Sequence, residues 1–276
     1  MLSRCIFQAS AAAAMLVGSM SLALAADCKP AVADADLVKP GTLVMSTNPT
    51  LPPLQFVDSS GELKGMRIEL GTEIAKRLCL TPEYIRIEFS AMVPGLQAGR
   101  WDLINTGIFF TAERAKLMQM IPYEKQAISV SVPLAAKGTL TKLEDLAGKT
   151  VGVENGGFEA AKTKVMNDEL TAKGLTPMTV RTFDNFALAY QALRAGQVDA
   201  VVSIDGVAKA YADRGDFARG ISGLYATPVA LAMKSKPLAE AVLKVLNDMK
   251  ADGSYQKLFD AYGVVATDGT LAISGP

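Results

Sequence analysis

Short apolar stretches alternate with amphipathic stretches along most of this chain, and few folds accommodate that order. Met66, Leu70, Ile74 and Leu78 recur every four residues and predict one buried face of a helix. Repeated strand and helix units favour parallel sheets covered by helices, so we expect an α/β fold. The predicted strands are 42–46, 84–89, 101–105, 149–153, 179–183 and 198–202, and the predicted helices are 66–78, 92–98, 159–172, one from a cap at Asp184 to Arg194, and one from Gly206.

Two blocks of the sequence resemble each other and predict two lobes of similar design. Residues 98–104 and 195–201 each pass from a helix end through glycine to an aspartate and a buried strand. Between them, 128–134 alternates like an extended strand that crosses from one lobe to the other. In such folds ligands bind at the carboxyl ends of the strands, so we expect a ligand cleft between the lobes.

Composition excludes several classes of function. Lys and Arg together number 28, as do Asp and Glu, so no charge excess attracts a nucleic acid. The chain has no histidine, which excludes Ser-His-Asp and Cys-His catalysis and imidazole metal sites. Its three cysteines form no C-x-x-C motif, so a four-thiolate zinc site is excluded too, and we expect no cofactor.

The first 25 residues are typical of a cleaved signal peptide. Arg4 is followed by an uncharged apolar stretch that ends in Ala23-Leu24-Ala25, the small-x-small pattern of a cleavage site. A transmembrane anchor is the alternative, but the apolar stretch is short for a span of about 20 residues. We therefore predict an exported protein.

Export leaves Cys28 and Cys79 in an oxidising compartment, where they could form a disulfide bond. Two unpaired thiols are the alternative. Because geometry controls bridging, the spacing alone leaves both open.

A series of short motifs resembles a known family over nearly the whole chain after residue 25. Their order and spacing are similar to those of the polar amino-acid-binding proteins of bacterial ABC importers, the extracellular solute-binding proteins of family 3. The motifs are 53–58, 61–66, 73–78, 93–102, 111–115, 143–153 and 249–258.

The resemblance implies a two-lobed periplasmic-binding-protein fold of type II, with parallel-rich sheets flanked by helices and a hinge of two strands. Lobe 1 would comprise 36–128 plus 231–276, and lobe 2 would comprise 131–228. The protein would be a periplasmic monomer that closes on a small amino-acid-like ligand and docks on an ABC permease.

Two charged residues would hold the ligand if the resemblance is followed. Arg114, in a short helix capped by Thr111, would bind the ligand carboxylate, because a guanidinium matches a carboxylate bidentately. A solvated surface arginine is the alternative. Asp205, at the end of a lobe 2 strand, would receive the ligand ammonium, although it could instead cap the helix that follows.

The remaining candidate residues would line the pocket. Phe89 stands where the family carries an aromatic side chain, while Leu51 stands where a second aromatic is common. Gly107 would offer its backbone at close range. An ordinary core role is the alternative for Phe89.

Two departures from the family pattern point to an apolar pocket. Phe109 replaces a Ser or Thr, and Gly157 with Phe158 replaces a turn rich in hydroxyl groups. No acidic pair is evident where a basic ligand side chain would end, and Asn48 lies near that place. We therefore expect an uncharged or aromatic ligand, bound with little pH dependence between about pH 6 and 8.

Two other functions fit the same resemblance. Some relatives are periplasmic dehydratases, and without histidine the general acid would be Glu88, Glu154 or Asp205 with a raised pKa. A free-standing ligand sensor with a separate partner is the other alternative. Fold alone does not decide between them.

Overall fold

The computed structural model describes residues 28–276, so the predicted signal peptide lies outside the described residues. None of the helices in 28–276 combines the length and the apolar character needed to cross a membrane.

Strands and helices alternate through the described chain, as the sequence pattern predicts. The α-helices are α1 (Met66–Arg77), α2 (Met92–Gln97), α3 (Ala112–Ala115), α4 (Phe158–Ala172), α5 (Phe186–Arg194), α6 (Asp205–Asp213), α7 (Lys236–Ala251) and α8 (Ser254–Tyr262). The strands are β1 (Thr42–Thr47), β2 (Thr50–Leu51), β3 (Gln55–Val57), β4 (Leu63–Lys64), β5 (Thr81–Arg86), β6 (Leu103–Phe109), β7 (Gln119–Val132), β8 (Thr150–Glu154), β9 (Thr179–Phe183), β10 (Ala200–Ile204), β11 (Ala218–Arg219), β12 (Leu224–Met233) and β13 (Val265–Ala266).

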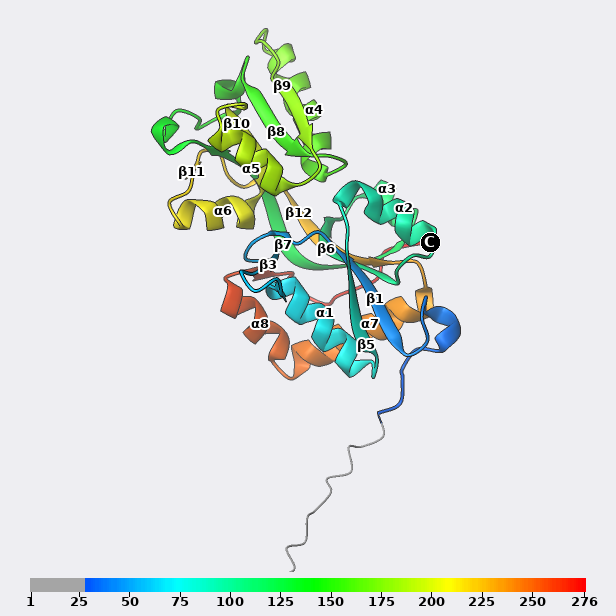
Figure 1. The fold of residues 1–276 in the computed structure, drawn as a ribbon. Helices are drawn as coiled ribbons and strands as arrows, with labels where there is room; N and C mark the ends of the chain where they lie inside the picture. Colours follow the sequence, from blue (N-terminus) through cyan, green and yellow to red (C-terminus); the bar gives the residue numbers. More distant parts are fainter. Residues whose placement is uncertain (1–27) are drawn as a thin grey trace, which may run out of the picture.

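One continuous sheet links two lobes, in the order β5-β1-β6-β12-β7-β10-β8-β9. The strands β5, β1 and β6 are parallel in lobe 1, and β8, β9 and β10 are parallel in lobe 2. The long strands β7 and β12 pair antiparallel and run from one lobe to the other (Figure 1). This is the mixed α/β, two-lobed architecture that the alternating pattern predicts.

The two similar sequence blocks each contain an aspartate, Asp102 or Asp199, and the two aspartates make equivalent hydrogen bonds in the two lobes. The N–H of Asp102 donates to the Val44 carbonyl, and its carboxylate accepts from the Val44 N–H at 2.8 Å. The N–H of Asp199 donates to the Thr150 carbonyl, and its carboxylate accepts from the Thr150 N–H at 2.7 Å. Each aspartate therefore fixes the start of a strand against its parallel neighbour.

Helix packing explains why α2 contains a glycine. The indole ring of Trp101 lies against Gly95, where an added Cβ would come within 2.0 Å of the ring. Trp101 belongs to a core that also contains Val44, Leu96 and Ile104. The close approach lets α2 cover the strands β1 and β6.

Some boundaries differ from the sequence predictions. The strand predicted at 84–89 ends at Arg86, and Phe89 begins a 3-10 helix (Phe89–Ala91). Asn185, not Asp184, caps α5 by accepting a hydrogen bond from the Leu188 N–H. Both residue types are good caps, and only the backbone geometry distinguishes them.

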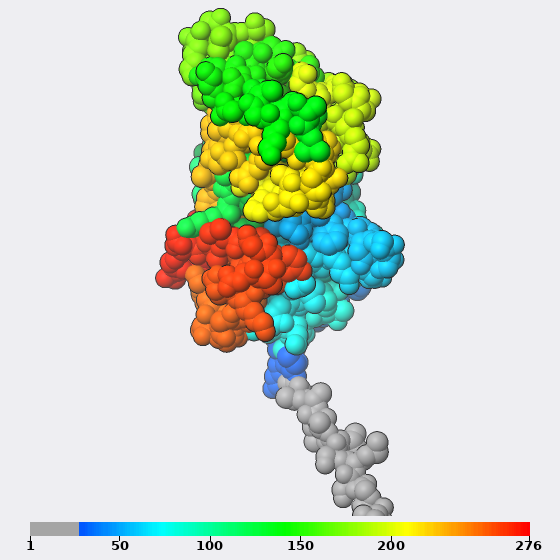
Figure 2. Space-filling view, turned by 90° about the vertical axis from the view of Figure 1, so that its left-hand side faces the viewer, coloured from blue at the N-terminus to red at the C-terminus, as the bar shows by residue number. Residues whose placement is uncertain are grey.

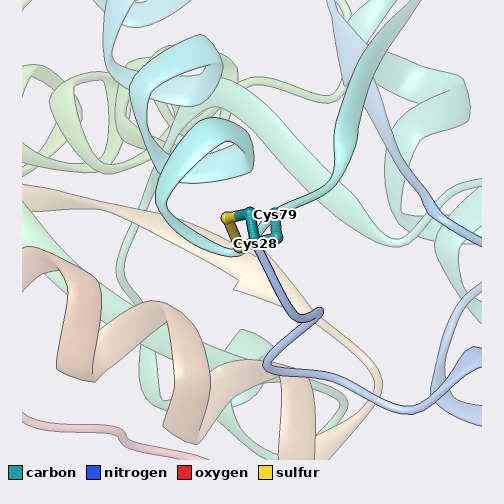
Figure 3. The surroundings of a disulfide bond; sticks show 2 residues. All are labelled: Cys28 and Cys79. Carbon is teal, nitrogen blue, oxygen red and sulfur yellow. A yellow bond between two sulfur atoms is a disulfide. The ribbon is translucent and has the colours of Figure 1, made fainter. Parts of the chain in front are cut away.

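A disulfide bond joins Cys28 to Cys79, with 5.5 Å between their Cα atoms (Figure 3). Cys79 follows the end of α1, so the bond attaches the start of the described chain to lobe 1. The Ala31 N–H donates to the Leu78 carbonyl beside it. Of the two alternatives that the sequence leaves open, the structure has the disulfide.

The two lobes are in contact in this structure. The yellow segment around α6 rests on the blue segment 50–57 of lobe 1 in the space-filling view (Figure 2). Pro53 and Leu54 line one cavity together with Gly206 and Lys209 of α6. The turn between β2 and β3 of lobe 1 therefore meets α6 of lobe 2.

Candidate functional site at the interface of the lobes

Polar contacts cross the interface between the strand ends of the two lobes. Asn48, directly after β1, donates from Nδ2 to Oε1 of Glu154 at the end of β8 (2.7 Å). Asn185, the cap of α5, donates from Nδ2 to Oε1 of Glu88 (3.2 Å). The carboxyl ends of β1 and β8 thus face each other, as expected for a ligand cleft in such a fold.

An aromatic pair fills the centre of this interface. Phe109 ends β6 in lobe 1, and Phe158 begins α4 in lobe 2. Their rings stack with centroids 4.5 Å apart and an interplanar angle of 22°. Phe109 is 2% exposed and Phe158 is 7% exposed. The structure therefore brings these two predicted pocket residues together as an apolar wall.

Arg114 lies beside the aromatic pair and contacts both lobes. Its Nη1 donates to the Phe109 carbonyl (2.8 Å) and its Nη2 to the Gly156 carbonyl of lobe 2 (3.4 Å). Its guanidinium lies 5.4 Å from the centroid of the Phe89 ring. Burial lowers the pKa of Arg114 below the ordinary value. Thr111 accepts a hydrogen bond from the Arg114 N–H, so the predicted cap is confirmed.

Three carboxyl groups, those of Glu88, Glu154 and Glu159, influence one another at the same interface. Burial raises the pKa of Glu154 well above its ordinary value, and the nearby Glu159 and Glu88 raise it further. Burial also raises the pKa of Glu159 to about 7. The sequence predicts a strand that ends beside Glu154. The approach of Glu154 to Asn48 and Glu88, however, depends on how the lobes meet.

Asp205 lies elsewhere in the interface. It is the first residue of α6, whose N-cap is Ile204, so the alternative role as a helix cap is wrong. Its carboxylate accepts hydrogen bonds from Ser129 Oγ and from Arg219 Nη2 (2.8 Å for Arg219). Asp205 also lines a cavity of about 390 Å³ with Gln126 of the hinge strand β7. Arg114 does not line that cavity, so the structure does not bring these two predicted ligand-binding residues together.

The other candidates, Leu51, Gly107 and Gly157, are buried. Leu51 is buried in β2. Gly107 has a φ of +75°, and a Cβ there would lie 2.0 Å from Cζ of Arg67, so glycine is required at this position. Gly157 is the N-cap residue of α4, with Glu159 Oε2 2.7 Å from where its Cβ would be.

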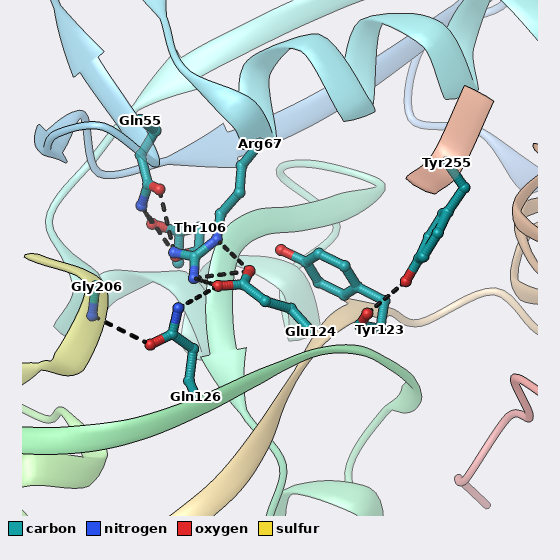
Figure 4. Close-up of polar contacts among 8 residues, drawn as sticks. All are labelled: Gln55, Arg67, Thr106, Tyr123, Glu124, Gln126, Gly206 and Tyr255. Atoms are coloured by element: carbon teal, nitrogen blue, oxygen red, sulfur yellow. Dashed lines mark hydrogen bonds and ion pairs between the residues drawn. The ribbon is translucent and has the colours of Figure 1, made fainter. Parts of the chain in front are cut away.

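A buried ion pair under the hinge was not predicted from the sequence (Figure 4). Arg67 of α1 donates to both carboxylate oxygens of Glu124 of β7, at 3.1 Å each, and to the Thr106 carbonyl at 2.6 Å. Gln126 donates to Glu124 and accepts from the Gly206 N–H of α6 at 3.4 Å. The network therefore connects lobe 1 through β7 to lobe 2.

Within residues 28–276, no group of three or more Cys, Asp and Glu side chains is arranged to hold a metal ion.

Comparisons with known proteins agree with the geometry. Residues 43–265 match the model of the bacterial extracellular solute-binding proteins, family 3. The L-cystine-binding protein TcyJ of Escherichia coli (strain K12) is 29% identical over 262 residues, which are 90% of this chain and 94% of the relative.

Solved structures are similar as well. An ancestral arginine-binding protein bound to arginine has a TM-score of 0.74 and 32% identity, over 80% of this chain and 98% of that one. An ancestral amino acid-binding protein, a precursor of cyclohexadienyl dehydratase, has a TM-score of 0.71 and 26% identity, over 80% of this chain and 95% of that one.

Proposed function

Because this chain belongs to family 3 of the bacterial extracellular solute-binding proteins, and has their two-lobed type II fold, we propose that its ligand binds between the lobes. The chain is a solute-binding protein of the amino-acid transport class. The ligand is a small amino-acid-like molecule held at the interface of Asn48, Glu154, Phe109, Phe158 and Arg114. The single observation that supports this placement is the set of polar and aromatic contacts that join strand ends of different lobes.

Contacts across the interface exist only when the lobes are closed. A ligand that adds contacts to both lobes stabilises the closed form by its difference in affinity for the two forms. Lobe 1 would comprise 36–128 plus 231–276 and lobe 2 would comprise 131–228, with β7 and β12 as the hinge. The pairing of β7 with lobe 1 strand β13 through Lys125 and with lobe 2 strand β10 through Ile128 supports these boundaries.

Export to the periplasm through the signal peptide 1–25, a monomeric state and delivery to the membrane subunits of an ABC permease are part of the same proposal. The disulfide between Cys28 and Cys79 supports the compartment, since disulfides persist where thiols are oxidised.

Arg114 is the residue that we propose for the ligand carboxylate. The guanidinium now donates hydrogen bonds to the carbonyl oxygens of Phe109 and Gly156. A ligand carboxylate would be a stronger acceptor, because its hydrogen bonds with the guanidinium are charge-assisted. We do not assign the ligand ammonium to Asp205, because its carboxylate accepts from Ser129 and Arg219 beside a cavity that Arg114 does not line.

Arg114→Ala should weaken the binding of an amino-acid ligand by at least about tenfold, because a bidentate contact to a charge is lost. A thermal-shift screen with amino acids identifies the ligand, and titration calorimetry then compares the variant with the wild type. Arg100→Ala is the matched control, since Arg100 is an exposed arginine of the same lobe. Unchanged affinity in Arg114→Ala would remove Arg114 from the site.

A dehydratase remains the second candidate, because a buried carboxyl with a raised pKa can act as a general acid. The similarity to the precursor of cyclohexadienyl dehydratase favours testing it. Turnover of prephenate or arogenate by the purified protein, lost in Glu154→Gln, would show an enzyme rather than a receptor.

A further inference from the structure

The turn between β8 and α4 carries a buried carboxyl group at each end. Glu154 is the last residue of β8 and is 3% exposed, and Glu159 lies in the first turn of α4 and is 2% exposed. A Cβ added to Gly157 would lie 2.7 Å from Oε2 of Glu159 and 3.9 Å from Cβ of Glu154. The two side chains therefore lie around the same glycine of lobe 2.

Lobe 1 covers this turn in the closed molecule. Asn48 donates a hydrogen bond to Glu154, and Arg114 donates one to the Gly156 carbonyl. A Cβ added to Gly156 would lie 3.4 Å from Cα of Ser90 in lobe 1. Because each of these contacts joins the two lobes, opening the lobes would break them and give water access to the turn.

The two carboxyl groups have few hydrogen-bond donors to support an ionised form. Oε1 of Glu159 is buried and has no hydrogen-bond partner among residues 28–276. The donor to Glu154 is the neutral amide of Asn48. A buried carboxylate without a cation is costly, whereas a protonated carboxyl group carries no charge. The closed interface therefore favours the protonated form of both groups.

The charged groups that lobe 1 brings to the turn do not compensate for this burial. Arg67 of α1 and Arg114 of α3 lower the pKa of Glu159. Arg67, however, is held in the ion pair under the hinge, and Arg114 donates to two carbonyl oxygens. Glu88 acts in the opposite direction, because it raises the pKa of Glu154.

The charged groups of lobe 2 around α4 are engaged elsewhere. The strands β8 and β10, which pack against α4, contain no charged residue other than Glu154. Lys162 of α4 lies over two aromatic rings, at 5.0 Å and 5.1 Å from their centroids. In the 3-10 helix before β8, Glu144 pairs with Lys173, and Asp145 accepts from backbone N–H groups.

The ionisation of both groups should therefore differ between the closed and the open molecule. Burial raises the pKa of Glu159 to about 7 and that of Glu154 well above the ordinary value of 4.5. In the open molecule the turn is hydrated, and hydration returns the pKa of a carboxyl group toward its ordinary range. The closed form thus binds protons more tightly than the open form, and by linkage protons favour the closed form.

We propose that the closing of the lobes is coupled to the uptake of protons by Glu154 and Glu159, so that acidic conditions favour the closed form and alkaline conditions the open form. A ligand that binds the closed form is then bound more tightly at the lower pH, because a larger fraction of the molecules is already closed. The coupling is a property of the ligand-free protein and does not depend on which ligand the protein takes.

Small-angle X-ray scattering of the ligand-free protein at about pH 5.5 and about pH 8.5 tests the coupling. The radius of gyration should be larger at the higher pH, at unchanged far-UV circular dichroism. The ratio of closed to open forms should fall by at least about tenfold, since a difference of one pKa unit between the two forms already changes this ratio by roughly tenfold.

The double variant Glu154→Gln with Glu159→Gln cannot ionise at these two positions. At both pH values it should therefore keep the smaller radius that the wild type has at about pH 5.5. If the double variant fails to fold, Glu159→Gln alone serves for the comparison. It should make the pH-dependent change in the ratio of closed to open forms at least about threefold smaller.

Glu169→Gln is the matched control, because Glu169 is an exposed glutamate of the same helix as Glu159. A glutamine at this position can still accept the hydrogen bond from the Tyr225 hydroxyl. This variant should show the same change between the two pH values as the wild type.

An equal or smaller radius of the wild type at about pH 8.5 would overturn the proposal. A larger radius that accompanies a loss of secondary structure would overturn it too, because the change would then be unfolding. So would a pH-dependent change as large in the glutamine variants of Glu154 and Glu159 as in Glu169→Gln. Each of these results leaves the proposed placement of the ligand intact, since no ligand is present in the experiment.

Discussion

Glu159 is a single carboxyl group whose ionisation depends on the fold. Buried in the first turn of α4, it has a pKa of about 7, compared with an ordinary value of 4.5. Arg114 and Arg67 lower this pKa, but burial outweighs them. The expectation of ligand binding that is independent of pH between 6 and 8 therefore stays a prediction, which the ionisation of Glu159 puts to the test. A chain without histidine acquires a group that titrates near neutral pH through burial alone.

The stability of the ligand-free protein should fall as pH rises from about 4.5 to 7. In this range the folded protein keeps the Glu159 proton while the unfolded chain has lost it, so deprotonation favours unfolding. Glu154, whose pKa is raised for the same reason, adds to the effect in the same direction. Melting temperatures measured across this range should decrease, and Glu159→Gln should flatten the decrease. An equal slope in Glu159→Gln and in the control Glu169→Gln would contradict the assignment.

The helix α1 and the strand β7 are joined by the buried pair Arg67 and Glu124. Both side chains are fully buried, with 3.0 Å between the closest charged atoms. Gly107 leaves space for the guanidinium, and Gln55 accepts a further hydrogen bond from it. Because Gln126 extends this network to the Gly206 N–H, the pair positions the hinge strand relative to α6.

Arg67→Met should destabilise the protein by about 3–5 kcal/mol, because it leaves Glu124 buried without its cation. The double variant Arg67→Met with Glu124→Leu should recover most of this loss, since no uncompensated charge remains. Urea denaturation measures both changes. A loss of less than about 1 kcal/mol in the single variant would mean that water or Gln126 replaces the arginine.

The molecule as a whole is closed by contacts between its own side chains. Phe109 with Phe158 and Asn48 with Glu154 join the lobes. These contacts contribute to the stability of the closed form. The ligand has to bind the closed form better than the open form.

Phe158→Ala should shift the ligand-free protein toward open conformations. An aromatic pair contributes about 1 kcal/mol beyond its buried area, which changes the ratio of closed to open forms by roughly fivefold. Small-angle X-ray scattering should show a larger radius of gyration than for the wild type. Leu134→Ala, at an exposed position, should leave the radius unchanged.

Local patterns in the sequence were sufficient to predict the architecture. The periodicity of Met66, Leu70 and Ile74, the paired aspartates Asp102 and Asp199, and the motif order predicted strands, helices and two lobes, because these depend on residues close in sequence. Phe109 and Phe158 were expected in the pocket from the resemblance to the family, at positions where this chain departs from the family pattern.

The pairing of polar side chains from different helices and strands was decided by tertiary structure alone. Glu154 meets Asn48, Arg67 pairs with Glu124, and Asp205 binds Arg219 across separations of 106, 57 and 14 residues. No local periodicity in the sequence predicts which strand ends face each other when the lobes close. Burial at that interface, rather than residue type, raises the pKa of Glu159, because desolvation exists only in the folded molecule.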